Sequence, residues 1–407
     1  MDMGLLTPAR PLHSGLRWIP YAIDVWCPVA RSSAVRAGKI VSTRLLGAPI
    51  ALFRGTDGQI HAVQDRCPHR GVELSLGRVC GSRIQCAYHG WMVDGSGDAV
   101  GANGKQVAAH AARTGSFVTA EANGLVWIFI GETPRTGTPS FAPPAFAPLN
   151  DSPSIDLLID LPVAAHWSLV LDNGVDLFHQ HLHRDVPFFF RIESLEGYET
   201  QGETFVVRYR ALISDESGRR RPALITIAVD RNIVALRFGD SLIIYGVPVP
   251  RSVDGRELTM WWMVRAAAPF TRRLLIRLLL PLIRRQVVRG FRQDCDVLAS
   301  EQRAFDAGFR DQLESNPAIF ALHQHIEQRV LKEAVTRGWE VPAGARQAAP
   351  LNLDRRRVLE QAQRGEIAVI ARSDGVPAIV APDRLAHVLP LTETFAAYVY
   401  GHFCLLA

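Results

Sequence analysis

The chain has 407 residues, of which 48% are hydrophobic and 21% charged, a composition typical of a folded protein with two or three domains. The 45 basic and 40 acidic residues leave a net charge of only +5, too small a basic excess for a dedicated nucleic-acid-binding protein. The same composition excludes a mainly disordered, collagen-like or coiled-coil chain.

Short apolar runs bounded by turn signals predict β structure in the first third of the chain. Pro49–Phe53, Ile60–Val63 and Gly124–Ile130 are such runs. Asp57-Gly58 and Asp94-Gly95 are pairs that favour tight hairpins, because glycine adopts positive φ without strain. We therefore predict a first domain of antiparallel β structure over residues 1–140.

A proline-rich stretch, Pro134–Pro153, indicates an extended linker and places the domain boundary. A helix is predicted around Trp167–Arg184, and a long helical region from about Arg272 to Val335. Between them, strands follow one another without intervening helices and therefore pair antiparallel; they are Thr204–Ile213, Leu224–Val229, Val234–Phe238, Leu242–Val249 and Glu257–Val264.

This order of helix, sheet and helix predicts an α+β domain over residues 141–350. The tail, residues 351–407, differs from both domains. It reads as a short helix ending near Gly365, followed by a hairpin of Ile367–Ala371 and Val376–Val380 across Asp374-Gly375. The role of this extension is not indicated by the sequence.

Two cysteines and two histidines form the first candidate site. Cys67-Pro68-His69 is followed, after an intervening stretch, by Cys86-Ala87-Tyr88-His89. Zinc accepts a set of two cysteines and two histidines, but zinc sites usually pair like ligands along the chain. The alternation of cysteine and histidine instead suits a two-iron cluster in which one iron takes both cysteines and the other both histidines.

The segments around these ligands resemble the Rieske [2Fe–2S] domain family. The match extends over Asp65-Arg66-Cys67-Pro68-His69-Arg70-Gly71 and over Gln85-Cys86-Ala87-Tyr88-His89-Gly90-Trp91. The resemblance implies a Rieske cluster held by Cys67, His69, Cys86 and His89.

A second candidate site lies in Asp172–His183, where three histidines fall within five residues. On an α-helix, Asp176, His179 and His183 would share a face, whereas His181 would point elsewhere. Two histidines and a carboxylate are the ligand set of mononuclear Fe(II) oxygenases. Solvated histidines on a surface helix are the alternative interpretation.

Asn173, Asp176, His179 and His183 resemble the Asn-x-x-Asp-x-x-His motif and second histidine of the Rieske non-haem iron oxygenases. The resemblance implies iron ligation by His179 and His183, and a bridging role for Asp176 between His179 and a cluster histidine. The third ligand should come from the segment Phe291–Leu298, where the best match is Asp294, with Asp296 and Glu301 as alternatives.

The resemblance covers about residues 17–310 and implies a helix-grip catalytic domain with an antiparallel sheet, in the terminal oxygenase component of a multicomponent system. Such a component uses O₂ and electrons from NAD(P)H, delivered by a separate reductase with or without a ferredoxin. We favour a monooxygenase that hydroxylates or oxidatively demethylates a largely apolar substrate. A ring cis-dihydroxylating dioxygenase is the near alternative, and an electron carrier or ligand-binding protein without the second iron is the distant one.

The resemblance also implies a homotrimer in which each cluster serves the iron of the adjacent subunit. The chain shows no dinucleotide-binding fingerprint, which agrees with the need for a separate reductase. Six cysteines and a start that lacks a secretory pattern predict a cytoplasmic protein. The basic, apolar segment Arg272–Pro281 is interpreted as a core-facing helix in preference to a membrane-surface helix.

Overall fold

The computed structural model describes most of the predicted first and second domains. The linker predicted over Pro134–Pro153 lies outside the described residues except for 142–144. The helix predicted before Gly365 also lies outside them. The domain boundaries near residues 140 and 350 therefore stay predictions. The described residues are 9–12, 16, 25–102, 112–130, 142–144, 154–183, 190–214, 219–252, 255–268, 273–309, 312–336, 368–371 and 377–380.

The first part of the chain forms small antiparallel sheets. Their elements are β2 Val25–Arg31, η2 Ser32–Ala34, β3 Ile40–Leu45, β4 Ala48–Arg54, β5 Ile60–Gln64, η3 Leu74–Leu76, β6 Arg78–Cys80, β7 Arg83–Gln85, β8 Met92–Asp94, β9 Ala99–Val100, β10 Ser116–Phe117, β11 Thr119–Ala122 and β12 Leu125–Ile130. The sheet orders are β10-β5-β4-β3, β11-β12-β2 and β6-β7-β8-β9. The predicted apolar runs thus appear as β4, β5 and β12, and Gly58 turns between β4 and β5 with φ +78°.

The second part is built on one antiparallel sheet of order β13-β19-β18-β17-β16-β15-β14. Its strands are β13 Ser154–Val163, β14 Phe190–Gln201, β15 Thr204–Ser214, β16 Arg220–Asp230, β17 Ile233–Phe238, β18 Leu242–Pro250 and β19 Leu258–Ala267. The helices are α1 Trp167–Val175, η4 Leu177–His183, α2 Arg273–Asp306 and α3 Pro317–Thr336. Short pairs join β1 Arg10–Pro11 to β20 Leu313–Glu314 and β21 Ala368–Ala371 to β22 Pro377–Val380.

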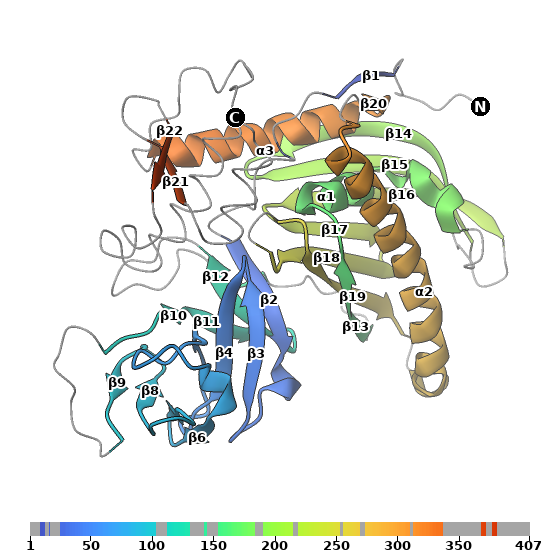
Figure 1. Cartoon of the computed structure of the whole chain (residues 1–407). Coiled ribbons are helices and arrows are strands. Elements are labelled where there is room, and N and C mark those ends of the chain that lie inside the picture. The colour runs from blue at the N-terminus through green and yellow to red at the C-terminus, as the bar shows by residue number, and fades with distance from the viewer. Residues whose placement is uncertain are drawn as a thin grey trace.

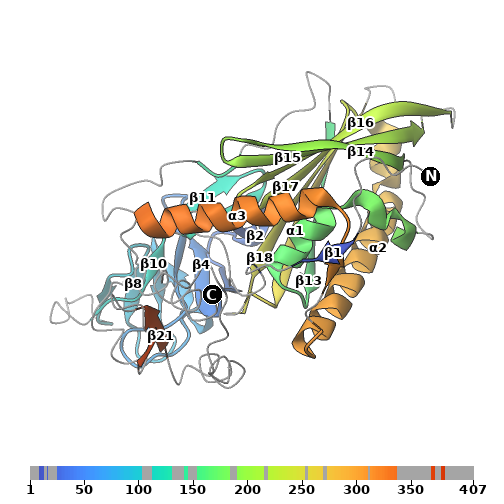
Figure 2. The ribbon, with the colours of Figure 1, turned by 90° about the horizontal axis from the view of Figure 1, so that it is seen from above.

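Three helices pack against the large sheet (Figures 1 and 2). Helix α1 contacts β16, β17 and β18 and lies between the other two helices; α2 contacts β13, and α3 contacts β14 and β15. The α+β class, with a β first domain before a domain with a large antiparallel sheet, is therefore confirmed.

Two hydrophobic clusters form the core. The larger one includes the buried residues Trp127 on β12, Trp167 on α1 and Tyr209 on β15, and so runs through both parts of the chain. A smaller cluster includes Phe53 and Ile84 together with Cys67 and Cys86 of the first candidate site. Backbone hydrogen bonds from Leu46 to Pro250 (2.9 Å) and from Gly47 to Arg251 (2.7 Å) also tie the two parts together.

In the second part of the chain, the sequence missed two strands of the large sheet and one helix break. Strands β13 and β14 form the two edges of the large sheet but were not predicted. The helix expected over Trp167–Arg184 ends as an α-helix at Val175, and the chain then continues as the 3-10 helix η4. The hairpin predicted in the tail is present as β21 and β22.

The first turns of α2 do not face the core as predicted. Leu274, Leu278 and Leu282 are 71%, 70% and 56% exposed, while Leu280 and Val287 on the opposite side pack against the large cluster. Among the described helices, none combines the length and the apolar character needed to cross a bilayer.

Gly97 offers a test of the turn that closes the sheet β6–β9. It has φ +86°, and a Cβ added there would lie 2.1 Å from the backbone oxygen of Thr114, whereas a Cβ added at Gly58, with φ +78°, meets nothing within 4 Å. We expect Gly58→Ala to cost about 1–2 kcal/mol for the left-handed backbone, and Gly97→Ala to cost clearly more because the backbone must also move. Calorimetric midpoints would compare them; equal shifts would contradict the close approach.

Candidate metal centres

Two loops of the same design carry the residues of the first candidate site. In the first loop the Cys67 N–H donates to the Val72 carbonyl (2.7 Å), and in the second the Cys86 N–H donates to the Trp91 carbonyl (2.7 Å). The glycines four residues after each cysteine, Gly71 and Gly90, both have φ +71° and donate to the carbonyl of that cysteine. Each loop thus folds back on itself around its cysteine.

The cysteines of these loops point inward and the histidines outward. Cys67 and Cys86 are 3% and 4% exposed, whereas His69 and His89 are exposed, with ring centroids 4.7 Å apart. His69 stacks on Trp91 at 4.7 Å with an interplanar angle of 1°. The stack restricts the rotation of the imidazole and so fixes the direction of its nitrogen.

The donor set suits a cluster with two cysteines on one iron and two histidines on the other. Burial and the neighbouring Cys86 thiol raise the pKa of Cys67, although the backbone N–H groups of His69 and Arg70 lower it. Those N–H groups would stabilise a metal-bound thiolate. Desolvation, His69 and Arg70 lower the pKa of His89, which favours the neutral imidazole that binds a metal. The four residues therefore fit a [2Fe–2S] cluster.

His179, His183 and Asp294 converge to form the second candidate site. The Oδ1 atom of Asp294 lies 3.6 Å from His179 Nε2 and 3.3 Å from His183 Nε2, and the two imidazole rings are 5.6 Å apart. Possible ligand atoms of these three residues lie within 4.8 Å of one another. Asp294 Oδ1 is buried and makes no hydrogen bond, which fits a carboxylate oxygen that would bind a metal ion.

Gln293 supports one of the two histidines. Its Oε1 lies 3.1 Å from His183 Nδ1, which leaves Nε2 of His183 directed at Asp294. Burial lowers the pKa of His183, but the carboxylate of Asp294 and the amide of Gln293 outweigh it, and the net shift is upward. No role was predicted for Gln293 from the sequence, because its contact with His183 joins residues 110 positions apart.

Asp176 marks the point where α1 ends. Its N–H still donates to the Asp172 carbonyl, but its own ψ of 98° is extended. Its carboxylate accepts hydrogen bonds from the Phe178 N–H (3.0 Å) and from Asn316 Nδ2 (3.2 Å). His179 Nδ1 contacts the backbone carbonyl of Asp176, so within one chain the expected contact between these residues uses the carbonyl in place of the carboxylate.

A buried network holds this end of α1. Tyr209 donates its hydroxyl hydrogen to the Val175 carbonyl (2.9 Å), and Asn316 Nδ2 donates to the Tyr209 oxygen (2.9 Å). Burial, first of all, and the charge of Asp176 raise the pKa of Tyr209, so it stays a donor. Nearby, His323 Nε2 lies 2.7 Å from Asp172 Oδ1. The sequence indicated none of these contacts.

His181 and the alternative carboxylates, Asp296 and Glu301, are not part of the candidate ligand group. His181 is exposed on η4, and Asp296 is exposed on α2. Glu301 accepts a hydrogen bond from Gln312 (2.9 Å). Among the described residues, only His179, His183 and Asp294 form a group of potential ligands of this kind.

A cavity of about 580 Å³ adjoins the second site. His179, His183 and Asp294 form part of its wall, and most of the remaining wall is apolar, from β17, β18, β19 and α2. Trp262 and Phe291, whose rings stack at 4.4 Å, connect the sheet to α2 in that wall. The site therefore combines polar metal-binding groups with space for an apolar molecule.

The two candidate sites lie far apart within one chain. The sheet β6–β9 is at one end of the molecule, and α2 with the green turn of η4 is at the other in both views (Figures 1 and 2).

Gln293 yields a prediction about the second site. Gln293→Leu should lower the affinity for Fe(II) by roughly 10- to 100-fold, because a ligating imidazole loses its orienting partner. Competition with a chelator measures this affinity. Gln286→Leu, two turns earlier on α2 and in the same surface groove as Gln293, is the matched control. An equal loss in both variants would show that the contact with His183 is not the cause.

Comparison with protein families and curated relatives supports the first site. The model of the Rieske [2Fe–2S] domain matches residues 25–111. The 4β-methylsterol monooxygenase of Methylococcus capsulatus is 32% identical over 182 residues, 44% of this chain and 49% of that protein. The phthalate 4,5-dioxygenase oxygenase subunit of Pseudomonas putida is 31% identical over 159 residues, 38% of this chain and 35% of that subunit. The chain thus spans about half or less of these relatives.

Solved structures extend the likeness over most of the chain. The terminal oxygenase of carbazole 1,9a-dioxygenase from Nocardioides aromaticivorans has a TM-score of 0.61 at 19% identity, covering 77% of this chain and 96% of that one. Dicamba monooxygenase bound to 3,6-dichlorosalicylic acid has a TM-score of 0.59 at 20% identity, covering 76% of this chain and 98% of that one. A reduced oxygenase–ferredoxin complex of carbazole 1,9a-dioxygenase has a TM-score of 0.56 at 20% identity, covering 80% of this chain and 95% of that one. The chain therefore carries a Rieske [2Fe–2S] domain and has the fold of the terminal oxygenases of Rieske systems, the family that its motifs resemble.

Proposed function

We propose that the chain is the terminal oxygenase component of a multicomponent Rieske system, which uses O₂ and NAD(P)H-derived electrons to hydroxylate, or oxidatively demethylate, a largely apolar organic substrate. The observation that carries this proposal is the convergence of His179, His183 and Asp294 at the wall of an apolar cavity in a chain with a Rieske domain. A simple electron carrier needs neither the second site nor the cavity.

The proposal assigns a role to each site residue. Cys67, His69, Cys86 and His89 hold the cluster, and His179, His183 and Asp294 hold one mononuclear Fe(II). When bound, that iron supplies the activation of O₂. The chain itself orients the ligands: Gln293 fixes His183, and the Asp176 carbonyl fixes His179.

The cavity supports an apolar substrate. Leu236 and Ile244 on the sheet face Val287 and Phe291 on α2 across this space, so water is a poor occupant and an apolar molecule gains by leaving water. We favour monooxygenation; the names of the relatives, a monooxygenase and a dioxygenase subunit, keep ring dihydroxylation as the alternative.

The electron donors are proposed to be separate proteins. The chain lacks a dinucleotide-binding fingerprint, and a structural neighbour was solved as a complex between oxygenase and ferredoxin. The exposed rings of His69 and His89 offer such a partner direct access to the cluster loops. A reductase, with or without a ferredoxin, would complete the system; the cytoplasmic location stays a prediction.

Metal analysis tests the proposed function. Purified wild-type protein should contain three irons per two acid-labile sulfides, and His183→Ala or Asp294→Ala should lower the ratio to two irons per two sulfides. Asp296→Ala is the matched control, because this exposed carboxylate lies two residues along the same helix. Asp176→Asn should keep both centres but slow reoxidation of the reduced cluster by O₂. A wild-type ratio of two to two would instead support an electron carrier.

We further propose that the active unit is shared between chains of a homotrimer. The separation of the two sites within one chain (Figures 1 and 2) supports this idea, because electron transfer over a long distance is slow. In a head-to-tail ring, the cluster loops of one subunit would lie beside Asp176 of the next, and its carboxylate would face His69 or His89 of the adjacent chain.

Complementation tests the shared site. A chain with a disabled cluster, Cys67→Ser, is co-expressed with a chain that lacks the mononuclear iron, His183→Ala. Each homotrimer should be inactive, whereas mixed trimers should recover part of the wild-type rate of O₂-dependent reoxidation, since one subunit's cluster would reduce the neighbour's iron. Absence of recovery in purified mixed trimers would show that electrons pass within one chain.

A further inference from the structure

The first six turns of α2 have an unusual composition for an exposed helix. Residues 273–293 contain six arginines and no acidic residue. Their charge of +6 exceeds the net +5 of the whole chain. The basic character of this protein is therefore concentrated on one segment.

The exposed side of this segment is a single ridge with two zones. Leu274, Leu278 and Leu282 occupy its first part, and Arg285, Arg289 and Arg292 continue it at the helical spacing of three or four residues. All six side chains are exposed. We call these six residues the leucine–arginine ridge.

The leucine zone also reaches the end of the molecule. The N-terminal end of α2 projects past the strands of the large sheet (Figure 1), and Leu275 and Leu279, beside the ridge, are 58% and 44% exposed. Exposed apolar clusters of this kind mark interaction surfaces in soluble proteins.

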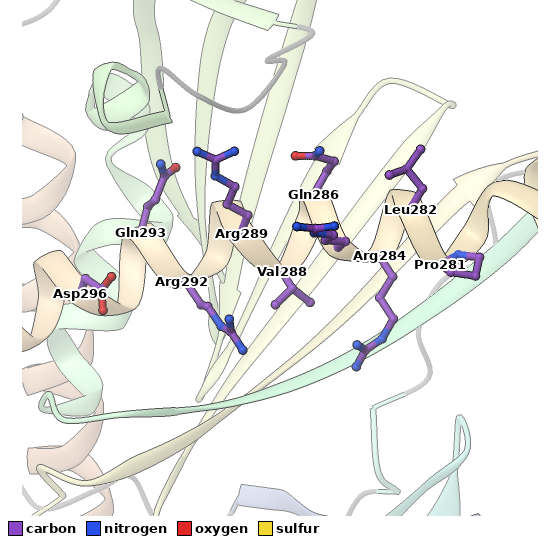
Figure 3. A pocket seen from close by; sticks show the side chains of 10 residues that line it. Pro281, Leu282, Arg284, Gln286, Val288, Arg289, Arg292, Gln293 and Asp296 are labelled. Atoms are coloured by element: carbon purple, nitrogen blue, oxygen red, sulfur yellow. The ribbon is translucent and has the colours of Figure 1, made fainter.

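The arginine zone lines an open groove beside the leucines. Arg284, Arg289 and Arg292 extend from α2 around it, together with Leu282 and Pro281 (Figure 3). Arg285 also lines the groove. Asp296 is the one acidic residue of this lining. The groove therefore presents mainly positive charge next to an apolar tip.

We propose that the leucine–arginine ridge docks on an anionic lipid surface, with the leucines among the acyl chains and the arginines at the headgroups. An apolar tip followed by cationic side chains is the arrangement that binds a membrane interface. A second copy of the same ridge offers no acidic side chain to pair with the arginines, so a symmetric contact between copies is disfavoured.

The docking would also bring the lipid phase to the cavity. Leu282 and Ile283 are 56% and 38% exposed and line the cavity as well as the surface. An apolar substrate dissolved in the bilayer could then pass to the cavity without crossing bulk water. This consequence rests on the proposed function, whereas the docking itself does not.

Co-sedimentation with vesicles tests the proposal on the purified full-length protein. Wild type should pellet with vesicles of equal parts phosphatidylcholine and phosphatidylglycerol, much less with pure phosphatidylcholine, and less as salt is added. Leu274→Gln/Leu278→Gln should weaken binding about tenfold or more, because glutamine gains no free energy from burial among the acyl chains, whereas leucine does. Arg285→Gln/Arg292→Gln should weaken it by about tenfold or more on the anionic vesicles only.

Two controls separate the ridge from general effects. Leu224→Gln/Leu313→Gln removes leucines that are 47% and 67% exposed elsewhere and should bind like wild type. His183→Ala should also bind like wild type, so that failure of docking and failure of the oxygenase function appear in different experiments.

Other results would overturn the proposal. Wild type that stays in the supernatant with anionic vesicles excludes lipid docking. Leu274→Gln/Leu278→Gln that pellets like wild type excludes the ridge as the docking surface. If wild type does not bind and the leucine variant has a lower mass by light scattering, the ridge is a contact between copies of the chain.

Discussion

The end of α1 at Asp176 is the constraint on which the second site depends. An uninterrupted α-helix would place His179 and His183 about 40° apart around its axis, whereas three residues per turn place them about 120° apart. The imidazoles can then approach Asp294 from two directions. Two hydrogen bonds stabilise the break: the Tyr209 hydroxyl donates to the Val175 carbonyl, and the Asn316 amide donates to the Asp176 carboxylate. Both partners are buried, so these polar groups compete with no water.

The candidate metal ligands could be predicted from the sequence, because metal binding restricts both the residue type and the spacing along the chain. The cluster loops are local structures, in which Cys67 and Cys86 each organise the following residues, so they can be recognised without the rest of the fold. Asp294 was harder, because its distance along the chain from His183 carries no geometric rule; likeness of its segment to the family suggested it, and the structure brings it to the histidines. The iron-binding role of these residues stays a prediction.

Features that depend on contacts between distant segments could not be predicted. Strand β14 contains Glu193, Glu196 and Glu199, whose spacing of three breaks the alternation of a regular strand. The strand tolerates this spacing because its register against β15 shifts at Glu193 and again at Glu196. Strand β13 lies between the proline-rich stretch and the helix predicted from Trp167, and no element was predicted there. The cavity arises where β17, β18 and β19 face α2, and no single segment carries its signature. The orientation of the leucines at the start of α2 was likewise wrong, because an apolar sequence does not reveal whether the sheet extends far enough to cover it.

Helix α2 links these features through its length. Its 34 residues span roughly 50 Å as a continuous helix, although Pro281 removes one backbone donor within it. The exposed leucines come first, then the cavity wall, then Gln293 and Asp294 beside the two histidines. A displacement of the exposed end would reach the carboxylate only through the turn that Pro281 interrupts. The tight stack of Phe291 on Trp262 opposes such a displacement, since it fixes α2 to the sheet one turn before Asp294. The same helix can thus be exposed at one end and hold a carboxylate in a defined position further along.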